Sequence, residues 1–165
     1  MFENYKVYEI EYGGKKMTFE TGKMCCLSNA SVLVRWGETV VLVNVTASAK
    51  PREGIDFFPL SVDFEEKLYA VGKIPGSFIK RESRPSDKAI LVDRPIRPLF
   101  PKDMRNDCSV VMTVMSVDPD CLPEIAGMVG TSFALSISDI PWNGPIAGIN
   151  VGLVDGEIIV SPDAA

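Results

Sequence analysis

The chain has 165 residues, of which 46% are hydrophobic and 24% charged, and its formal net charge is −5. These values are typical of a soluble domain with one well-buried core, and no run of about 18 apolar residues indicates a membrane span. The chain has no histidine, which excludes Ser-His-Asp and Cys-His catalysis within it. Carboxylate or lysine acid–base chemistry, metal-assisted chemistry and reactions that need little covalent help from the protein stay open.

The N-terminal residues lack the basic, apolar and small-residue regions of a signal peptide, so we expect a cytoplasmic protein. The four cysteines are Cys25, Cys26, Cys108 and Cys121, and they show no C-x-x-C pair and no metal-ligand spacing. We therefore expect reduced cysteines that belong to the core.

Three glycine-containing turns predict β-hairpins, because each separates two runs of alternating or β-branched residues. They are Gly13-Gly14, Gly37-Glu38 and Asp155-Gly156. Residues 57–70 and 109–118 also alternate and are predicted to be strands.

Residues 123–139 predict a helix, because apolar residues recur there at helical spacing after Pro123 and Glu124. Gly127 and Gly130 within it favour a close approach to another element. A shorter helix is predicted over residues 85–92, ended by Pro95. Strands first and helices between later strands indicate an α+β fold, a mixed sheet with helices on one face.

The stretch from residue 73 to residue 101 differs in charge from the rest of the chain. It holds seven lysines and arginines against three acids, or +4, so the remainder sums to −9. Such a basic island in an acidic protein points to one anionic ligand held at one place. Phe78 lies beside Lys80 and Arg81 in this island, and an aromatic ring next to cations suits a single strand of nucleic acid.

Several motifs occur in order along the chain. Residues 76–87 read GSFIKRESRPSD, residues 93–101 read DRPIRPLFP, and residues 115–148 include MSVDPD, EIAGMVG, SISDIP and GPIAG. Together they resemble the bacterial polynucleotide phosphorylase family, in its first RNase PH-like domain, over essentially all 165 residues. The resemblance implies an RNase PH-like β-α-β-α fold for residues 1–165, as a single domain that forms the N-terminal core of a longer, truncated enzyme.

The resemblance also implies a function. Members of this family degrade RNA from its 3′ end with inorganic phosphate as co-substrate, release nucleoside diphosphates, and run in reverse as polymerases. They work as homotrimers, join RNA-degradation complexes and need Mg²⁺. Their phosphate pocket and metal-binding acids lie in the second core domain, so no catalytic and no metal residue is assigned to this chain.

By resemblance, Phe78 stacks on single-stranded RNA at the mouth of a trimeric ring, and Lys80 and Arg81 contact phosphates. Arg84, Arg94 and Arg97 are further candidates for RNA binding, although Asp93 and Glu82 could instead hold them in structural ion pairs. Alternatively, Phe78 is a loop residue that packs onto the core, and Lys80 and Arg81 belong to a solvated charged loop. Asp63 and Glu65 share a strand face, which is only a weak indication of a metal site.

Three departures from the family qualify this assignment. Isoleucine stands at position 79 where the family has a second aromatic residue, and lysine at position 80 replaces an arginine. The family usually has about four more residues between Val92 and Asp93, so either the protein has a genuine deletion there or it contains those residues and the printed sequence omits them. Two other functions stay open, a non-catalytic RNA-binding and oligomerisation module and a stand-alone RNase PH-like exoribonuclease.

Overall fold

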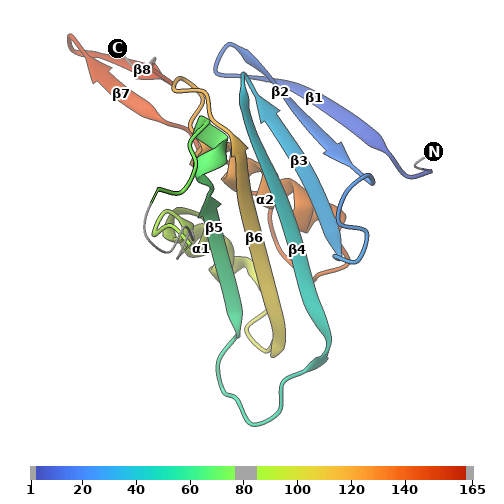
Figure 1. The fold of residues 1–165 in the computed structure, drawn as a ribbon. Coiled ribbons are helices and arrows are strands. Elements are labelled where there is room, and N and C mark those ends of the chain that lie inside the picture. The colour runs from blue at the N-terminus through green and yellow to red at the C-terminus, as the bar shows by residue number, and fades with distance from the viewer. Residues whose placement is uncertain (1–2, 77–84, 163–165) are drawn as a thin grey trace.

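The computed structural model describes residues 3–76 and 85–162, and residues 1–2, 77–84 and 163–165 lie outside the described part. Six strands form one sheet in the order β1-β2-β3-β4-β6-β5, and two more form a separate hairpin (Figure 1). The strands are β1 (Lys6–Tyr12), β2 (Lys15–Thr21), β3 (Ala30–Trp36), β4 (Thr39–Pro51), β5 (Leu60–Glu66), β6 (Asn106–Ser116), β7 (Val151–Val154) and β8 (Glu157–Val160). The helices are α1 (Ala89–Ile96) and α2 (Pro123–Ile137), with 3₁₀ turns η1 (Leu68–Val71) and η2 (Arg97–Leu99).

The three predicted hairpins are confirmed. The glycine-containing turns join β1 to β2, β3 to β4 and β7 to β8, and all three strand pairs are antiparallel. Gly37 has φ 56° and Gly156 has φ 85°, a left-handed backbone that glycine adopts without a Cβ clash.

The sheet is mixed because β5 pairs parallel with β6, whereas β6 pairs antiparallel with β4. The predicted strand over residues 57–70 is only partly right. β5 ends at Glu66, the alternation of polar and apolar residues stops at Leu68, and residues 68–71 form η1 instead. Gly72 closes η1 in a left-handed conformation with φ 68°.

The core lies between one face of the sheet and the two helices, which Figure 1 shows behind the strands. Val41, Val43 and Val45 of β4 are fully buried at alternate positions, as are Val110 and Met112 of β6. This alternation is the pattern of strands with one covered face. The predicted α+β fold with helices on one face is confirmed.

α2 lies close to the sheet at two glycines, as the sequence predicts. A Cβ atom on Gly130 would lie 2.5 Å from Val34 Cγ2 and 3.0 Å from Val43 Cγ2. A Cβ atom on Gly127 would lie 3.1 Å from Met112 Sδ. Any side chain at position 130 would therefore push the helix away from β3 and β4.

α1 differs from its prediction, because it covers Ala89–Ile96 rather than residues 85–92 and contains Pro95 instead of ending before it. Val92 and Ile96 are both fully buried one turn apart, so packing favours a helix over these residues. Pro95 lies in the last turn, where its missing N–H leaves only the carbonyl of half-exposed Leu91 without a helical partner.

In the part of the chain that the structure describes, neither α1 nor α2 has the length and apolar character needed to cross a membrane.

Candidate functional site

The residues predicted to bind RNA fall into two groups. Phe78, Lys80, Arg81 and Arg84 lie outside the described residues. Arg94 lies in the last turn of α1, and Arg97 directly follows that helix. The described residues also define where the first group leaves and rejoins the fold.

β5 anchors both ends of the segment that carries the first group. On the N-terminal side, β5 leads into η1, where Gly72 donates its N–H to the carbonyl of Tyr69 at 3.0 Å. On the C-terminal side, Ser86 donates its N–H to the carbonyl of Phe64 at 2.6 Å. Phe64 is a fully buried residue of β5, so the chain returns to the strand that it left. The segment thus leaves the described part of the chain after η1, which follows β5, and rejoins it beside β5.

Lys88 links this return point to β5 and α2. Its Nζ lies 2.8 Å from Glu66 Oε1 and 3.5 Å from Glu124 Oε2. Burial by itself lowers the pKa of Lys88, but the two carboxylates outweigh it and the pKa is raised. Burial by itself raises the pKa of Glu66, but hydrogen bonds from Lys88 and Ser86 outweigh it and the pKa is lowered. This three-residue bridge was not predicted from the sequence, because its members come from distant parts of the chain and form no local pattern.

Arg97 is held by the fold through Nε and Nη2 of its guanidinium. Its Nε and Nη2 lie 3.1 and 2.6 Å from the two carboxylate oxygens of Asp93, and Nη2 also donates to the carbonyl of Leu60 at 3.1 Å. Arg94 is exposed and has no ion pair with another described residue. Of the two, Arg94 has the freer guanidinium for a phosphate, and the assignment of both to RNA stays a prediction.

A cavity of about 290 Å³ opens beside Lys88. Its walls are mainly apolar, and its charged lining is Glu66, Lys67, Lys88, Asp118 and Glu124. Backbone N–H groups of Asp120 and Glu38 hold the pKa of Asp118 below its usual value, so this carboxyl stays ionised at neutral pH. Carboxylates thus outnumber ammonium groups, and α2 begins there with Pro123, which has no N–H to offer an anion. The cavity does not suit inorganic phosphate.

The carboxylates of β5 have partners of their own. Asp63 accepts a hydrogen bond from Ser61 Oγ at 3.2 Å, and Glu65 lies 3.1 Å from Lys67 Nζ. Within residues 3–76 and 85–162, no three histidine, cysteine, aspartate or glutamate side chains are grouped so that they could hold a metal ion. The described residues therefore do not fit Mg²⁺.

The prediction that all four cysteines are core residues is right for two of them and wrong for the others. Cys108 and Cys121 are 2% and 0% exposed, and burial raises the pKa of Cys108 to about 11. Cys25 and Cys26 are exposed in the loop between β2 and β3. Their burial was predicted because free cysteine is usually a core residue, but Gly22, with φ 80°, turns the chain out of β2 just before them.

Comparison with known proteins places this arrangement in a family. Residues 13–141 match the family model described as the 3′ exoribonuclease family, domain 1. Proteins named polyribonucleotide nucleotidyltransferase from Ruminiclostridium cellulolyticum and Clostridioides difficile are 63% and 59% identical to the chain over 96% and 99% of its length. The corresponding protein of Staphylococcus epidermidis is 55% identical over 100% of the chain. The chain spans only 23–24% of the length of these relatives.

The fold itself has a solved counterpart. The crystal structure of rice (Oryza sativa) Rrp46 matches 98% of this chain and 69% of its own chain, with a TM-score of 0.63 and 16% identity. At that identity the similarity concerns the fold alone, and it supports the RNase PH-like assignment.

The alignments also bear on the four residues expected between Val92 and Asp93. The alignment with the S. epidermidis protein runs over 169 positions and covers the whole of this 165-residue chain, so about four positions have no counterpart here. α1 runs unbroken through Val92 and Asp93, and the N–H of Arg97 bonds to the carbonyl of Asp93. The number of unmatched positions agrees with the four residues expected between Val92 and Asp93, and a deletion there stays a prediction.

Proposed function

Because this chain belongs to the 3′ exoribonuclease family, domain 1, we propose that it is the N-terminal core domain of a longer phosphorolytic exoribonuclease. The longer enzyme degrades RNA from the 3′ end to nucleoside diphosphates and polymerises them in the reverse direction. The observation that carries this proposal is the similarity of at least 96% of the chain to enzymes named polyribonucleotide nucleotidyltransferase, of whose length it forms about a quarter.

The reaction suits a chain without histidine. An oxygen of inorganic phosphate attacks the phosphorus of the 3′-terminal linkage, and the 3′ oxygen of the preceding nucleotide leaves. Phosphate is itself the nucleophile, so the protein mainly positions groups and stabilises charge. We place the phosphate site in another part of the longer enzyme, because carboxylates outnumber ammonium groups in the cavity beside Lys88. We place the Mg²⁺ site there as well, because the described residues form no group of three possible metal ligands.

While another part of the enzyme carries out the reaction, this domain would bind the RNA strand and form part of the trimeric ring. Phe78, Lys80, Arg81 and Arg84 would grip single-stranded RNA from the β5 edge of the sheet, and Arg94 would extend the basic surface along α1. The longer enzyme would assemble as a homotrimer in the cytoplasm, act in mRNA turnover, and join RNA-degradation complexes.

Two other functions predict different activities. A stand-alone exoribonuclease would release ADP from poly(A) and phosphate with this chain alone. A non-catalytic RNA-binding module would leave the longer protein inactive as well. Our proposal predicts ADP release from the longer protein and none from the 165-residue chain, and the same assay on both separates the three.

The binding surface is tested by a salt series on the longer enzyme. Replacing Lys80 and Arg81 with alanine removes phosphate contacts, so each lost contact should lower the slope of log affinity against log salt by about 0.7. Phe78→Ala removes stacking and no charge, so affinity should fall by about 1–3 kcal/mol while the slope stays constant. Unchanged affinity and slope in both variants would remove these residues from the RNA surface.

A further inference from the structure

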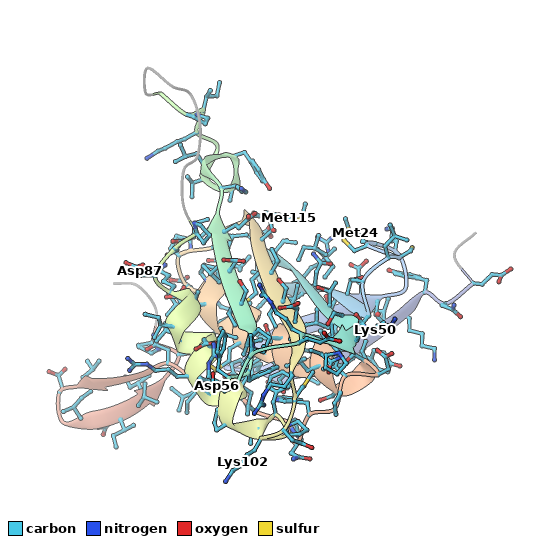
Figure 2. All side chains as sticks on the ribbon, turned by 90° about the horizontal axis from the view of Figure 1, so that it is seen from below. Met24, Lys50, Asp56, Asp87, Lys102 and Met115 are labelled. Carbon is cyan, nitrogen blue, oxygen red and sulfur yellow. The ribbon has the colours of Figure 1, made fainter. Side chains whose placement is uncertain are left out.

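Two of the four cysteines lie where the fold gives them no core role. Cys25 and Cys26 are adjacent and both exposed, in the loop that joins β2 to β3. Met24, the residue before them, lies across the molecule from Asp87, which precedes α1 (Figure 2). This pair of thiols is therefore separate from the candidate RNA-binding site.

The backbone conformation lets the two thiols act together. In an extended strand, neighbouring side chains point to opposite faces, so two adjacent cysteines could not share a ligand. Cys25 instead has φ 53°, in the left-handed region, where neighbouring side chains are no longer opposed. Residues other than glycine adopt this conformation rarely.

Hydrogen bonds hold the loop in this shape. Ser28 donates to the carbonyl of Cys25 twice, from its N–H at 3.0 Å and from its hydroxyl at 2.7 Å. The hydroxyl of Ser31 donates to the carbonyl of Met24. Asn29 then ties the end of the loop to the fold, because it donates to Asp139 and accepts the N–H of Ala47, both at 2.8 Å. The thiols are therefore presented on a loop whose backbone is already ordered, which lowers the entropic cost of binding.

The ligand set selects the kind of ion. Thiolates favour soft metals such as Cu(I), Zn²⁺ and iron–sulfur clusters. Zn²⁺ and such clusters need further protein ligands, and no group of three suitable side chains exists among residues 3–76 and 85–162. A soft monovalent ion is satisfied by fewer ligands, and two thiolates are what the loop provides.

We propose that Cys25 and Cys26 form a two-thiolate site for a soft monovalent metal ion of the Cu(I) class. On binding, each sulfur loses its proton to solvent and forms one bond to the metal, with no change in oxidation state. The resulting site carries one net negative charge, and Lys23 is the cation closest to it in the chain. Because protons are released, affinity should rise with pH.

The test is Cu(I) transfer from a coloured competing chelator to the chain under reducing, oxygen-free conditions. We expect the wild-type chain to withdraw one equivalent of Cu(I). Cys25→Ser and Cys26→Ser should each weaken binding by about 100-fold or more, because the second sulfur no longer acts at high effective concentration. Cys108→Ala and Cys121→Ala are the matched controls and should keep the full equivalent, since both residues are buried.

Protection from alkylation gives a second readout on the unaltered chain. Trypsin cleavage after Lys23 and Arg35 releases Cys25 and Cys26 together on one peptide that lacks the other two cysteines. Cu(I) should protect that peptide from iodoacetamide and leave the low labelling of the peptide with Cys108 and Cys121 unchanged. The proposal is overturned if the chain takes no Cu(I) from the chelator, or if either single serine variant binds as tightly as wild type.

Discussion

α2 packs along its length against β3 and β4, whereas α1 has only two fully buried side chains. Nine of the fifteen residues of α2 are buried, against Val92 and Ile96 among the eight of α1. Polar contacts attach the two ends of α1: Lys88 before the helix pairs with Glu66 and Glu124, and Arg97 after it is oriented by Asp93 and donates to the carbonyl of Leu60. The helix beside the candidate RNA site is thus attached at few points and by contacts that respond to pH and salt.

The largest loss of stability should follow from removing a buried side chain that attaches α1 to the core. Ile96→Ala should lower the free energy of unfolding by about 2–5 kcal/mol, because the side chain is fully buried. Ile90→Ala, on the same helix but 49% exposed, is the matched control and should change stability by less than about 1 kcal/mol. Urea unfolding of the two variants measures the difference, and equal losses would mean that α1 is not anchored at Ile96.

The stability of α2 should be sensitive to atoms added at its two glycines, because these lie close to the sheet. Gly130→Ala gains about 1 kcal/mol in helix propensity but places a Cβ atom 2.5 Å from the stiff side chain of Val34, and overpacking costs about 1–3 kcal/mol. We expect a net loss of stability. Gly127→Ala meets the flexible Met112 sulfur at 3.1 Å and the buried ring of Phe64 at 3.2 Å, so it should cost less stability than Gly130→Ala. Thermal unfolding of both variants checks the order, and a more stable Gly130→Ala would contradict the close packing.

The charged attachment of α1 should depend on pH. The pKa of Glu66 is lowered in the folded state, so its contribution is complete above the ordinary value of 4.5 and is lost as the pH falls through the folded value. Glu66→Gln should cost about 1 kcal/mol or less at pH 7, since the pair is partly exposed, and the cost should shrink below pH 4.5. Glu157→Gln, in the exposed β8, is the control. If Glu66→Gln lowers the free energy of unfolding by the same amount at pH 7 and below pH 4.5, the ion pair between Glu66 and Lys88 does not stabilise the fold.

The smallest changes in stability should distinguish Arg94, in the last turn of α1, from Arg97, which directly follows the helix. Arg97→Ala should lower stability by about 0.5–1 kcal/mol, because it breaks the bidentate pair with Asp93. Arg94→Ala should leave stability unchanged within about 0.5 kcal/mol and should flatten the salt dependence of RNA binding by the longer enzyme. Urea unfolding and a salt series measure the two properties, and a stability loss confined to Arg94→Ala would reverse the assignment.

The sequence predicted the parts of the fold that depend on neighbouring residues. Gly13-Gly14, Gly37-Glu38 and Asp155-Gly156 indicated the hairpins because a turn and its flanking alternation are local. The bounds of α1 were wrong because burial of Val92 and Ile96 outweighs the tendency of Pro95 to end a helix. The Glu66–Lys88–Glu124 bridge was not predicted, because its three residues meet only in the tertiary structure. Cys25 and Cys26 were wrongly predicted to be buried, because the course of their loop is not evident from the type of residue.

The parallel pairing of β5 with β6 has a consequence for the order of folding. Tyr12 and Lys15 pair across a two-residue turn, whereas Leu60 pairs beside Cys108 only after the whole intervening connection has closed. Non-local pairings of this kind form late, because closing the intervening loop costs conformational entropy before any stabilising contact between the strands has formed. During synthesis, the hairpins of β1 to β4 can therefore form on the emerging chain, but the β5 edge has no partner until β6 has left the ribosome. We expect the β5 edge of the sheet to become ordered on a nascent chain only after β6, which ends at Ser116, has been made and has left the ribosome.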